Sequence, residues 1–326
     1  RRTAALASSS ASPAAQDELF DTALARLAEH YREYRFLVAG ELLKTLRARI
    51  ASMTGRAAGQ ASAALEAFLA EGGECAGLEA RVRVCEEALQ SLNDDHGWAF
   101  MSDANGCRMH QRTEADGAMS VKIESLLEGV RPSDTLKIWR EASLYPHWFP
   151  FVTAGKVLVE RHPAEVVSHL EINQFFGMLD LVVEGFACDH LGEGYQLLCI
   201  RSVRSRDVPD VAAFPPHPSV AFKHKPLSMR IALTISMMFE PISPTSVRFC
   251  YQITQPIPDS TPRWLVSFIL ENGMAKIFKK LKEVGQGIMT AKTSPHRDFL
   301  NSQAYAHTGR WLDKSVEEYL QKVGAA

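Results

Sequence analysis

The stretch PRWLVSFILENGMAKIFKKLKEVGQGI, residues 262–288, decides the fold. Its polar residues Lys276, Lys279, Lys280 and Glu283 lie on one side of a helical projection. Apolar or small residues spaced three and four apart form a stripe on the other side: Val266, Leu270, Gly273, Ile277, Leu281, Val284 and Ile288. The pattern predicts one long amphipathic helix, with Thr261 as its N-cap and Pro262 at its first position.

Two alternating segments, residues 227–239 and 245–254, precede this helix and predict antiparallel strands. In the first segment one face is apolar and must be buried, and it consists of Met229, Ile231, Leu233, Ile235, Met237 and Phe239. An antiparallel sheet followed by one long helix suggests a sheet wrapped around that helix. Such a shape can enclose an apolar ligand.

A hairpin over residues 181–203 allows its register to be predicted. If residues 191–194 form the turn, opposite residues have numbers that sum to 385, so Glu184 faces Arg201. This pair is either a polar anchor for a lipid headgroup or a cross-strand ion pair on the outer face, and we favour the second. The other face carries Val183, Gly185, Ala187, Leu198 and Ile200, and its small residues can leave room for a ligand.

Elsewhere the periodicity predicts several further elements. Helices are expected from Asp17 to Leu92, with breaks at Gly55, Gly59 and the pair at 72–73. A hairpin joins residues 107–112 to 119–127, and Ser133 is expected to cap a short helix. Strands are expected near 156–161, 166–173, 181–189 and 195–203, and a short amphipathic helix at 310–323. These elements predict a leader at 1–16, a helical extension at 17–94, a ligand-binding domain at 95–290 and a tail at 291–326.

The composition narrows the functional classes. The 326 residues carry a net charge of −2, which gives no general attraction to nucleic acid, so we expect no nucleic-acid partner. Six cysteines without CxxC spacing indicate buried thiols in a reducing compartment. We therefore expect a cytoplasmic protein, with organelle targeting as the alternative if the Ala- and Ser-rich residues 1–16 are the remnant of a transit peptide. No cofactor or metal is expected.

With these elements assembled, residues 98–288 resemble a START domain, the StAR-related lipid-transfer module. The resemblance lies in Trp98 before a hairpin, the entry Gly129-Val130-Arg131-Pro132-Ser133 into a short helix, and Trp148-Phe149-Pro150 after it. It continues in Met229-Arg230-Ile231, Pro256-Ile257-Pro258 and Pro262-Arg263-Trp264-Leu265-Val266. One departure is Leu179-Asp180, where many START domains have Arg-Asp at the start of a central strand.

The resemblance implies an α+β helix-grip fold: a curved antiparallel sheet around the C-terminal helix, with an all-α N-terminal extension. It also implies binding of a sterol, phospholipid or sphingolipid and transient membrane contact, without catalytic residues. Lys276, Lys279 and Lys280 are the candidate membrane-docking residues. The expected lipid-binding residues are Val183, Gly185, Ala187, Leu198, Ile200, Ile231, Leu233, Ile235, Phe249, Tyr251, Val266, Leu270, Met274 and Ile277.

Two other functions compete with lipid transfer. A helix-grip enzyme of the cyclase or hydrolase kind would need titratable groups in the tunnel, and the candidates are His169, Glu171, Glu184 and Arg201. A protein-interaction module would instead have large side chains filling the space beside Gly185, Ala187 and Gly273. Catalytic motifs such as GxSxG, HExxH and GxGxxG are absent from the sequence.

Overall fold

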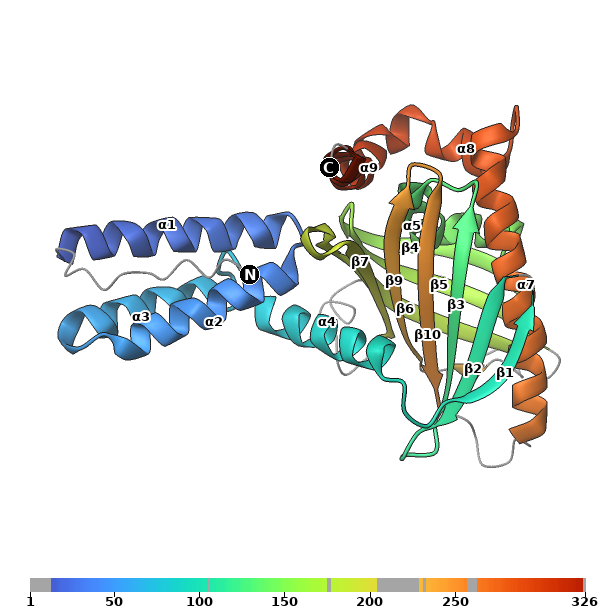
Figure 1. The fold of residues 1–326 in the computed structure, drawn as a ribbon, viewed down its shortest axis with the longest axis horizontal. Coiled ribbons are helices and arrows are strands. Elements are labelled where there is room, and N and C mark those ends of the chain that lie inside the picture. The colour runs from blue at the N-terminus through green and yellow to red at the C-terminus, as the bar shows by residue number, and fades with distance from the viewer. Residues whose placement is uncertain are drawn as a thin grey trace. The chain divides into compact units, whose positions relative to one another are not determined.

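The computed structural model describes residues 13–104, 106–174, 177–203, 229–230, 233–256 and 263–324. Side chains are described for the same residues except 13–19, 104, 174, 177–180, 229–230 and 263–272. The predicted cap at Thr261 and Pro262 therefore lies outside the described residues. The chain divides into two compact units, Arg1–Glu86 and Glu87–Ala326, and each is described by itself (Figure 1).

The first unit is helical. Its helices are α1 (Pro13–Arg32), α2 (Phe36–Ser52), α3 (Gly55–Leu69) and residues 78–86 of α4 (Leu78–Asn93). The predicted break at Gly59 is wrong, because this residue lies inside α3. Tyr34, with a φ of 57°, instead separates α1 from α2. The unit's apolar core includes the fully buried side chains of Leu27, Phe36 and Leu65.

The second unit contains one curved sheet, in which ten strands are found among the described residues. Its order is β1-β2-β3-β10-β9-β7-β6-β5-β4, and β8 pairs in parallel with β6 whereas the other neighbours are antiparallel. The strands are β1 (Ala99–Ala104), β2 (Cys107–Thr113), β3 (Met119–Glu128), β4 (Val152–His162), β5 (Glu165–Gln174), β6 (Gly177–His190), β7 (Tyr195–Ser202), β8 (Met229–Arg230), β9 (Thr234–Ser243) and β10 (Ser246–Gln255).

The register of this sheet follows the alternation of its side chains. In the hairpin of β6 and β7, Glu184 pairs with Arg201 and Gly185 with Ile200, as the sum of 385 predicts. The turn is the 3₁₀ segment η2 (Leu191–Glu193), followed by Gly194 with a φ of 94°. Glycine adopts this left-handed conformation without strain. The predicted register of the hairpin is confirmed.

Two helices, the short α5 and the long α7, cover the concave face of the sheet. Helix α5 (Pro132–Arg140) begins at Pro132, so the predicted cap at Ser133 is wrong: Arg131 precedes the helix and Ser133 lies within its first turn. The 3₁₀ segment η1 (Ala142–His147) follows it. Helix α7 (Arg263–Thr290) is the long helix expected from the sequence, and it buries Ile277, Leu281 and Ile288. The structure therefore has the predicted helix-grip architecture (Figure 1).

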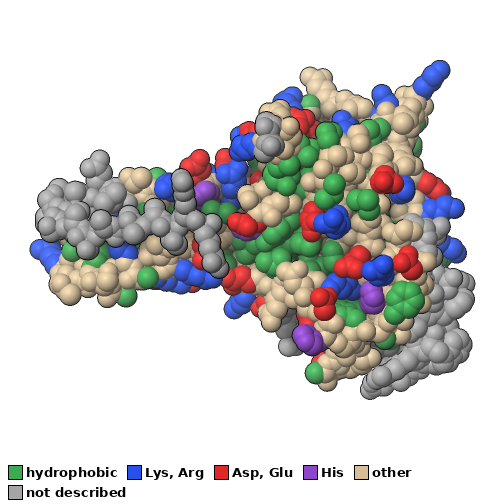
Figure 2. All heavy atoms as spheres, viewed as in Figure 1, with side chains coloured by type: hydrophobic (Ala, Val, Ile, Leu, Met, Phe, Trp, Pro, Cys, Tyr) green, Lys and Arg blue, Asp and Glu red, His purple; other side chains and the backbone are tan. Residues whose placement is uncertain are grey.

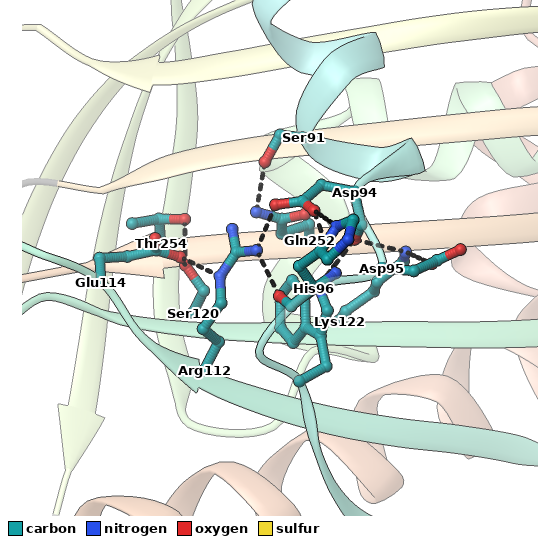
Figure 3. A network of polar contacts seen from close by, with 11 residues as sticks. Ser91, Asp94, Asp95, His96, Arg112, Glu114, Ser120, Lys122, Gln252 and Thr254 are labelled. Carbon is teal, nitrogen blue, oxygen red and sulfur yellow. Dashed lines mark hydrogen bonds and ion pairs between the residues drawn. The ribbon is translucent and has the colours of Figure 1, made fainter.

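The end of α4 that belongs to the second unit is tied to the outer face of β2 and β10 (Figure 3). Arg112 Nη1 donates to Asp94 Oδ2 at 2.5 Å, and Gln252 Nε2 donates to Ser91 Oγ at 2.5 Å. The backbone N–H of His96 and the Arg112 guanidinium lower the pKa of Asp94 to about 2. The carboxylate therefore stays charged at neutral pH and keeps its bond to Arg112.

Acidic and basic side chains are interspersed over the face of β3, β9 and β10 that Figure 2 shows. One such pair joins Arg248 and Glu240 on neighbouring strands, with 2.5 Å between Nη1 and the carboxylate. Mixed charge of this kind keeps a surface soluble without a field of one sign.

The chain after α7 adds three short elements: α8 (Pro295–Leu300), η3 (Gln303–Tyr305) and α9 (Ala306–Gly324). The predicted helix at 310–323 corresponds to α9, whereas α8 was not predicted. Ser294 caps α8 by accepting from the backbone N–H of Arg297 at 3.1 Å. These elements lie at the end of the sheet near α5 (Figure 1).

Two glycines of α7 provide a matched test of its packing. A Cβ at Gly285 would lie 2.5 Å from Val130 Cγ1, whereas a Cβ at Gly287 would have no atom within 4 Å. We expect Gly285→Ala to lower the free energy of unfolding by about 2 kcal/mol through overpacking. Gly287→Ala should raise it by about 1 kcal/mol, because alanine favours the helix. Urea denaturation measures both, and an equal effect of the two variants would contradict this packing of α7 on Val130.

Candidate functional site

An apolar cavity of about 140 Å³, here called the main cavity, lies between the concave face of the sheet and helices α5 and α7. Ile200 and Ile235 form part of its wall on the sheet, Trp139 projects from α5, and Met274 and Ile277 project from α7. The side chains described in its wall carry no net charge. An isolated charge would lose several kcal/mol of hydration here, so the cavity suits an uncharged, apolar group.

A second cavity of about 40 Å³, here called the inner cavity, adjoins the main cavity on the side of α9. Gly185 and Ala187 of β6 and Leu198 of β7 form its floor, and Leu312 of α9 contributes to its wall. The small side chains at 185 and 187 leave this space open. Both cavities share the same wall residues where they meet, namely Trp139, Tyr145, Leu170, Val183 and Ile200.

Aromatic rings form the side of the cavities opposite β6 and β7. Trp139 stacks on Tyr251 with ring centroids 5.7 Å apart and meets Trp148 edge-on at 5.4 Å. Phe249 packs against Tyr251 and Phe278 behind this surface. Rigid rings with few rotamers hold the wall in shape when the space beside it is not filled by side chains.

The polar groups around the cavities are neutral or internally paired. Burial raises the pKa of the Tyr145 and Tyr251 hydroxyls, so both stay protonated at neutral pH. Tyr145 donates its hydroxyl hydrogen to the backbone oxygen of Trp139 at 2.5 Å. The indole Nε1 of Trp139 has no hydrogen-bond partner among the described residues. Ser168 adds one hydroxyl group to the wall of the inner cavity.

Arg140 is the charged residue at the edge of the inner cavity among those described. Its Nε donates to the backbone oxygen of Pro163 at 2.7 Å, and its Nη2 lies 2.9 Å from Glu160 Oε1. Glu141 forms a further ion pair with it. Burial raises the pKa of Glu141 although Arg140 opposes that shift. The guanidinium charge is thus held by carboxylates, so the inner cavity itself is an apolar space.

The structure brings most of the expected lipid-binding residues to these two cavities, and their role in binding stays a prediction. Phe249 is buried but contributes to the aromatic packing rather than to the wall. Ile231 lies outside the described residues, as do the side chains of Val266 and Leu270. The expected residues that line a cavity are Val183, Gly185, Ala187, Leu198, Ile200, Leu233, Ile235, Tyr251, Met274 and Ile277.

Glu184 and Arg201 point away from both cavities, because neighbouring residues of a strand alternate between the faces of the sheet. Arg201 Nη2 donates to Glu184 Oε2 at 3.1 Å, and Arg161 of β4 also pairs with Glu184. Arg161 in turn lies 3.1 Å from Glu165. The pair is a cross-strand ion pair on the outer face, the interpretation that the sequence favours.

The residues proposed for an enzyme share this outer face. His169 and Glu171 of β5 alternate with the cavity-lining Ser168 and Leu170, and therefore lie on the same side as Glu184. These side chains therefore line neither the main cavity nor the inner cavity. Beside Gly185 the Ile200 side chain would lie 3.3 Å from an added Cβ, and Gly185 and Ala187 both line the inner cavity of about 40 Å³.

Lys276, Lys279 and Lys280 are exposed on α7, on the side away from the cavities. Lys280 Nζ donates to Glu283 Oε2 at 2.6 Å. Among the described helices, none is long and apolar enough to cross a membrane.

Several residues that line the cavities were not predicted from the sequence. Trp139 and Tyr145 occupy α5 and η1, where the helical pattern marks them as core but not as cavity walls. Leu170 of β5 belongs to a strand that was predicted, and its alternation with polar residues was a usable signal. Leu312 comes from the C-terminal tail, so no local pattern connects it with β6.

Comparison with solved structures identifies the fold. Human StAR-related lipid transfer protein 5 superposes with a TM-score of 0.53 at 16% identity, covering 64% of this chain and 95% of that one. Human STARD10 superposes with a TM-score of 0.54 at 13% identity, covering 71% and 86%. No family model matches the sequence, and no curated protein matches it either. The chain has a START-like helix-grip fold.

Replacing Glu184 separates a structural role from a role in binding. Glu184→Gln removes the charge that Arg161 and Arg201 share, and we expect a loss of about 2 kcal/mol in the free energy of unfolding. Affinity for lipid should stay unchanged, because the side chain lies on the opposite face of the sheet. Urea denaturation and a lipid titration measure the two effects.

The control is Glu240→Gln, which breaks the exposed pair with Arg248 on the same face and should cost about 0.5 kcal/mol or less. A marked loss of lipid affinity in Glu184→Gln alone would establish Glu184 as a polar anchor.

Proposed function

We propose that this protein binds one lipid in the main and inner cavities and carries it between membranes. The observation that carries the proposal is the pair of adjoining apolar cavities enclosed by a START-like sheet and its helices. Apolar burial contributes about 25 cal/mol per Å² and drives the binding. The described walls hold no cluster of titratable groups that would perform chemistry, so binding and transfer is the simplest use of this space.

The main cavity is smaller than a lipid and must widen to accept one. A cavity of about 150 Å³ holds a molecule of the size of benzene. The main cavity has about 140 Å³, so a ligand with a long chain or several rings requires a shift of the wall. The sequence suggests movement of α7 or of the loop 204–225, and that loop lies outside the described residues.

Phe151 is the wall residue whose geometry best fits an entrance. Its side chain lines the main cavity, is 39% exposed and reaches to 3.9 Å from the Cβ position of Gly273 on α7. Its backbone has a φ of 71°, which is unfavourable for an aromatic residue. Strain of this kind often marks a functional position. We propose that the lipid enters between Phe151 and α7.

The state of the thiols supports a proposal for the compartment. All six cysteines lie within the described residues, are buried and form no disulfide bond there. Burial raises the pKa of Cys75 and of Cys250 to about 12, so both thiols stay protonated and unreactive. We propose a reducing compartment such as the cytoplasm, where unpaired cysteines are the rule.

The proposed function is tested by native mass spectrometry after incubation with vesicles of phosphatidylcholine, phosphatidylserine, ceramide and cholesterol. We expect one lipid per chain. Ile235→Trp narrows the main cavity and should weaken binding at least about tenfold, because the larger side chain occupies space that the ligand needs. The control Thr234→Trp changes the next residue of β9, which is exposed, and should bind as the wild type does. An unmodified protein that takes up no lipid would contradict the proposal.

Membrane docking is tested by reversing charges on α7. Lys276→Glu with Lys279→Glu should slow lipid transfer between phosphatidylserine vesicles at least about tenfold, since each lysine near an anionic surface contributes about 1 kcal/mol. Transfer between phosphatidylcholine vesicles should change little. The control is Lys314→Glu with Lys322→Glu, which makes the same charge change on exposed positions of α9. Equal slowing by both double variants would show a general charge effect rather than docking by α7.

A further inference from the structure

Helix α9 lies against the end of the cavities. Leu312 of α9 is 1% exposed and lines the inner cavity, opposite Ala187 and Leu198 of the sheet. The helix also contacts α5 and β9 (Figure 1). It follows η3 and α8, beyond the end of the long helix α7. A segment that follows the sheet and α7 in the chain thus supplies part of the wall of the inner cavity.

Polar contacts to three elements fix the orientation of α9. Lys137 of α5 donates to Asp313 Oδ1 at 2.6 Å and also lies 3.6 Å from Asp134, whose side chain is 1% exposed. Lys137 is buried and Asp313 is partly exposed, so salt screens this ion pair less than it screens a fully exposed one. The neighbouring residue Leu312 is thereby held toward the inner cavity.

Two further bonds hold the helix on either side of this ion pair. Thr308 Oγ1 donates to Glu160 Oε1 of β4 at 3.3 Å. Gln196 Nε2 of β7 donates to Ser315 Oγ at 3.4 Å. Because anchors lie before and after Leu312, the helix cannot rotate this side chain out of the wall without breaking several of them.

The chemistry at the inner cavity suits the end of a hydrocarbon chain. Its walls are aliphatic and aromatic except for Ser168 and Arg140, and the Arg140 guanidinium is engaged by Glu141, Glu160 and the Pro163 carbonyl. A carboxylate or phosphate placed here would meet two glutamates and lose its hydration. A terminal methyl group has no polar hydration to lose and gains apolar contacts with the wall.

We propose that α9 is the end wall of the ligand site and that Leu312 sets the length of the hydrocarbon chain that fits. The proposal rests on the proposed function and adds a ligand class: a lipid whose chain end, not its headgroup, occupies the inner cavity. Each additional buried methylene then strengthens binding about fourfold until the chain reaches Leu312. Beyond that length the affinity stops rising.

The test is a series of saturated fatty alcohols of roughly 12 to 20 carbons, whose dissociation constants are measured on the full chain, with a gain of about fourfold per methylene expected up to the limit. The wild type should show a plateau at one chain length. Leu312→Ala removes three carbon atoms from the wall and should move the plateau to chains about two to three carbons longer. Leu312→Phe should move it to shorter chains.

Val316→Ala is the matched control, since Val316 is 2% exposed on the same helix and is not part of the described cavity wall. It should lose a similar kind of packing and keep the wild-type plateau. If Leu312→Ala does not fold, Leu312→Val replaces it, with an expected shift of about one carbon.

Two results would overturn the proposal in different ways. If the wild type shows a plateau that none of the Leu312 variants moves relative to Val316→Ala, then α9 is not the end wall, while lipid binding stands. If the wild type binds no alcohol of the series and no lipid from the vesicle panel, the proposed function fails and the inference fails with it.

Discussion

The apolar concave face of the sheet is the constraint on which the rest of the structure depends. Strands β5, β6, β7, β9 and β10 all turn hydrophobic side chains to this side, and two helices must cover them. The packing of helix α7 on this side differs between its two ends. At Gly285 it packs so closely on Val130 that a Cβ would overlap, whereas at Gly273, three turns earlier, Phe151 is at ordinary van der Waals distance. One helix therefore combines a tightly packed end with an end beside the cavity.

Local periodicity predicted most of the fold. Alternation at period 2 located the strands, and one turn length sufficed to pair Glu184 with Arg201. Boundaries that depend on tertiary context were missed. The six residues of β1 show no clear alternation, and they form a strand because they pair with β2. Pro132, with its fixed φ, starts α5 before Ser133 can act as a cap.

The site was predicted less completely than the fold, for a physical reason. Alternation shows which residues of a strand share a face, and for the hairpin of β6 and β7 the resemblance to START domains favoured the face of Gly185 and Ile200 as the inner one, where both line a cavity. It does not show whether a buried side chain meets another side chain or open space. That depends on elements far apart in the chain, such as α5 with Trp139 and α9 with Leu312. Phe249 illustrates the difference, since it is as buried as the wall residues yet lies behind them.

The strained backbone at Phe151 has a consequence for the rate at which the proposed lipid ligand would be released. A left-handed conformation at a non-glycine residue costs roughly 1 kcal/mol or more, and Phe151 has this conformation in the structure. On the proposal that the lipid enters beside Phe151, an opening that relaxes this backbone would release that cost and bring the two states nearer in free energy than glycine at this position would. Each kcal/mol of strain in the closed state would lower the affinity for the ligand about fivefold. The same strain would lower the barrier to release of the ligand. If the proposed transfer holds, residence time of the lipid matters as much as its affinity, because a carrier has to release its ligand at a second membrane.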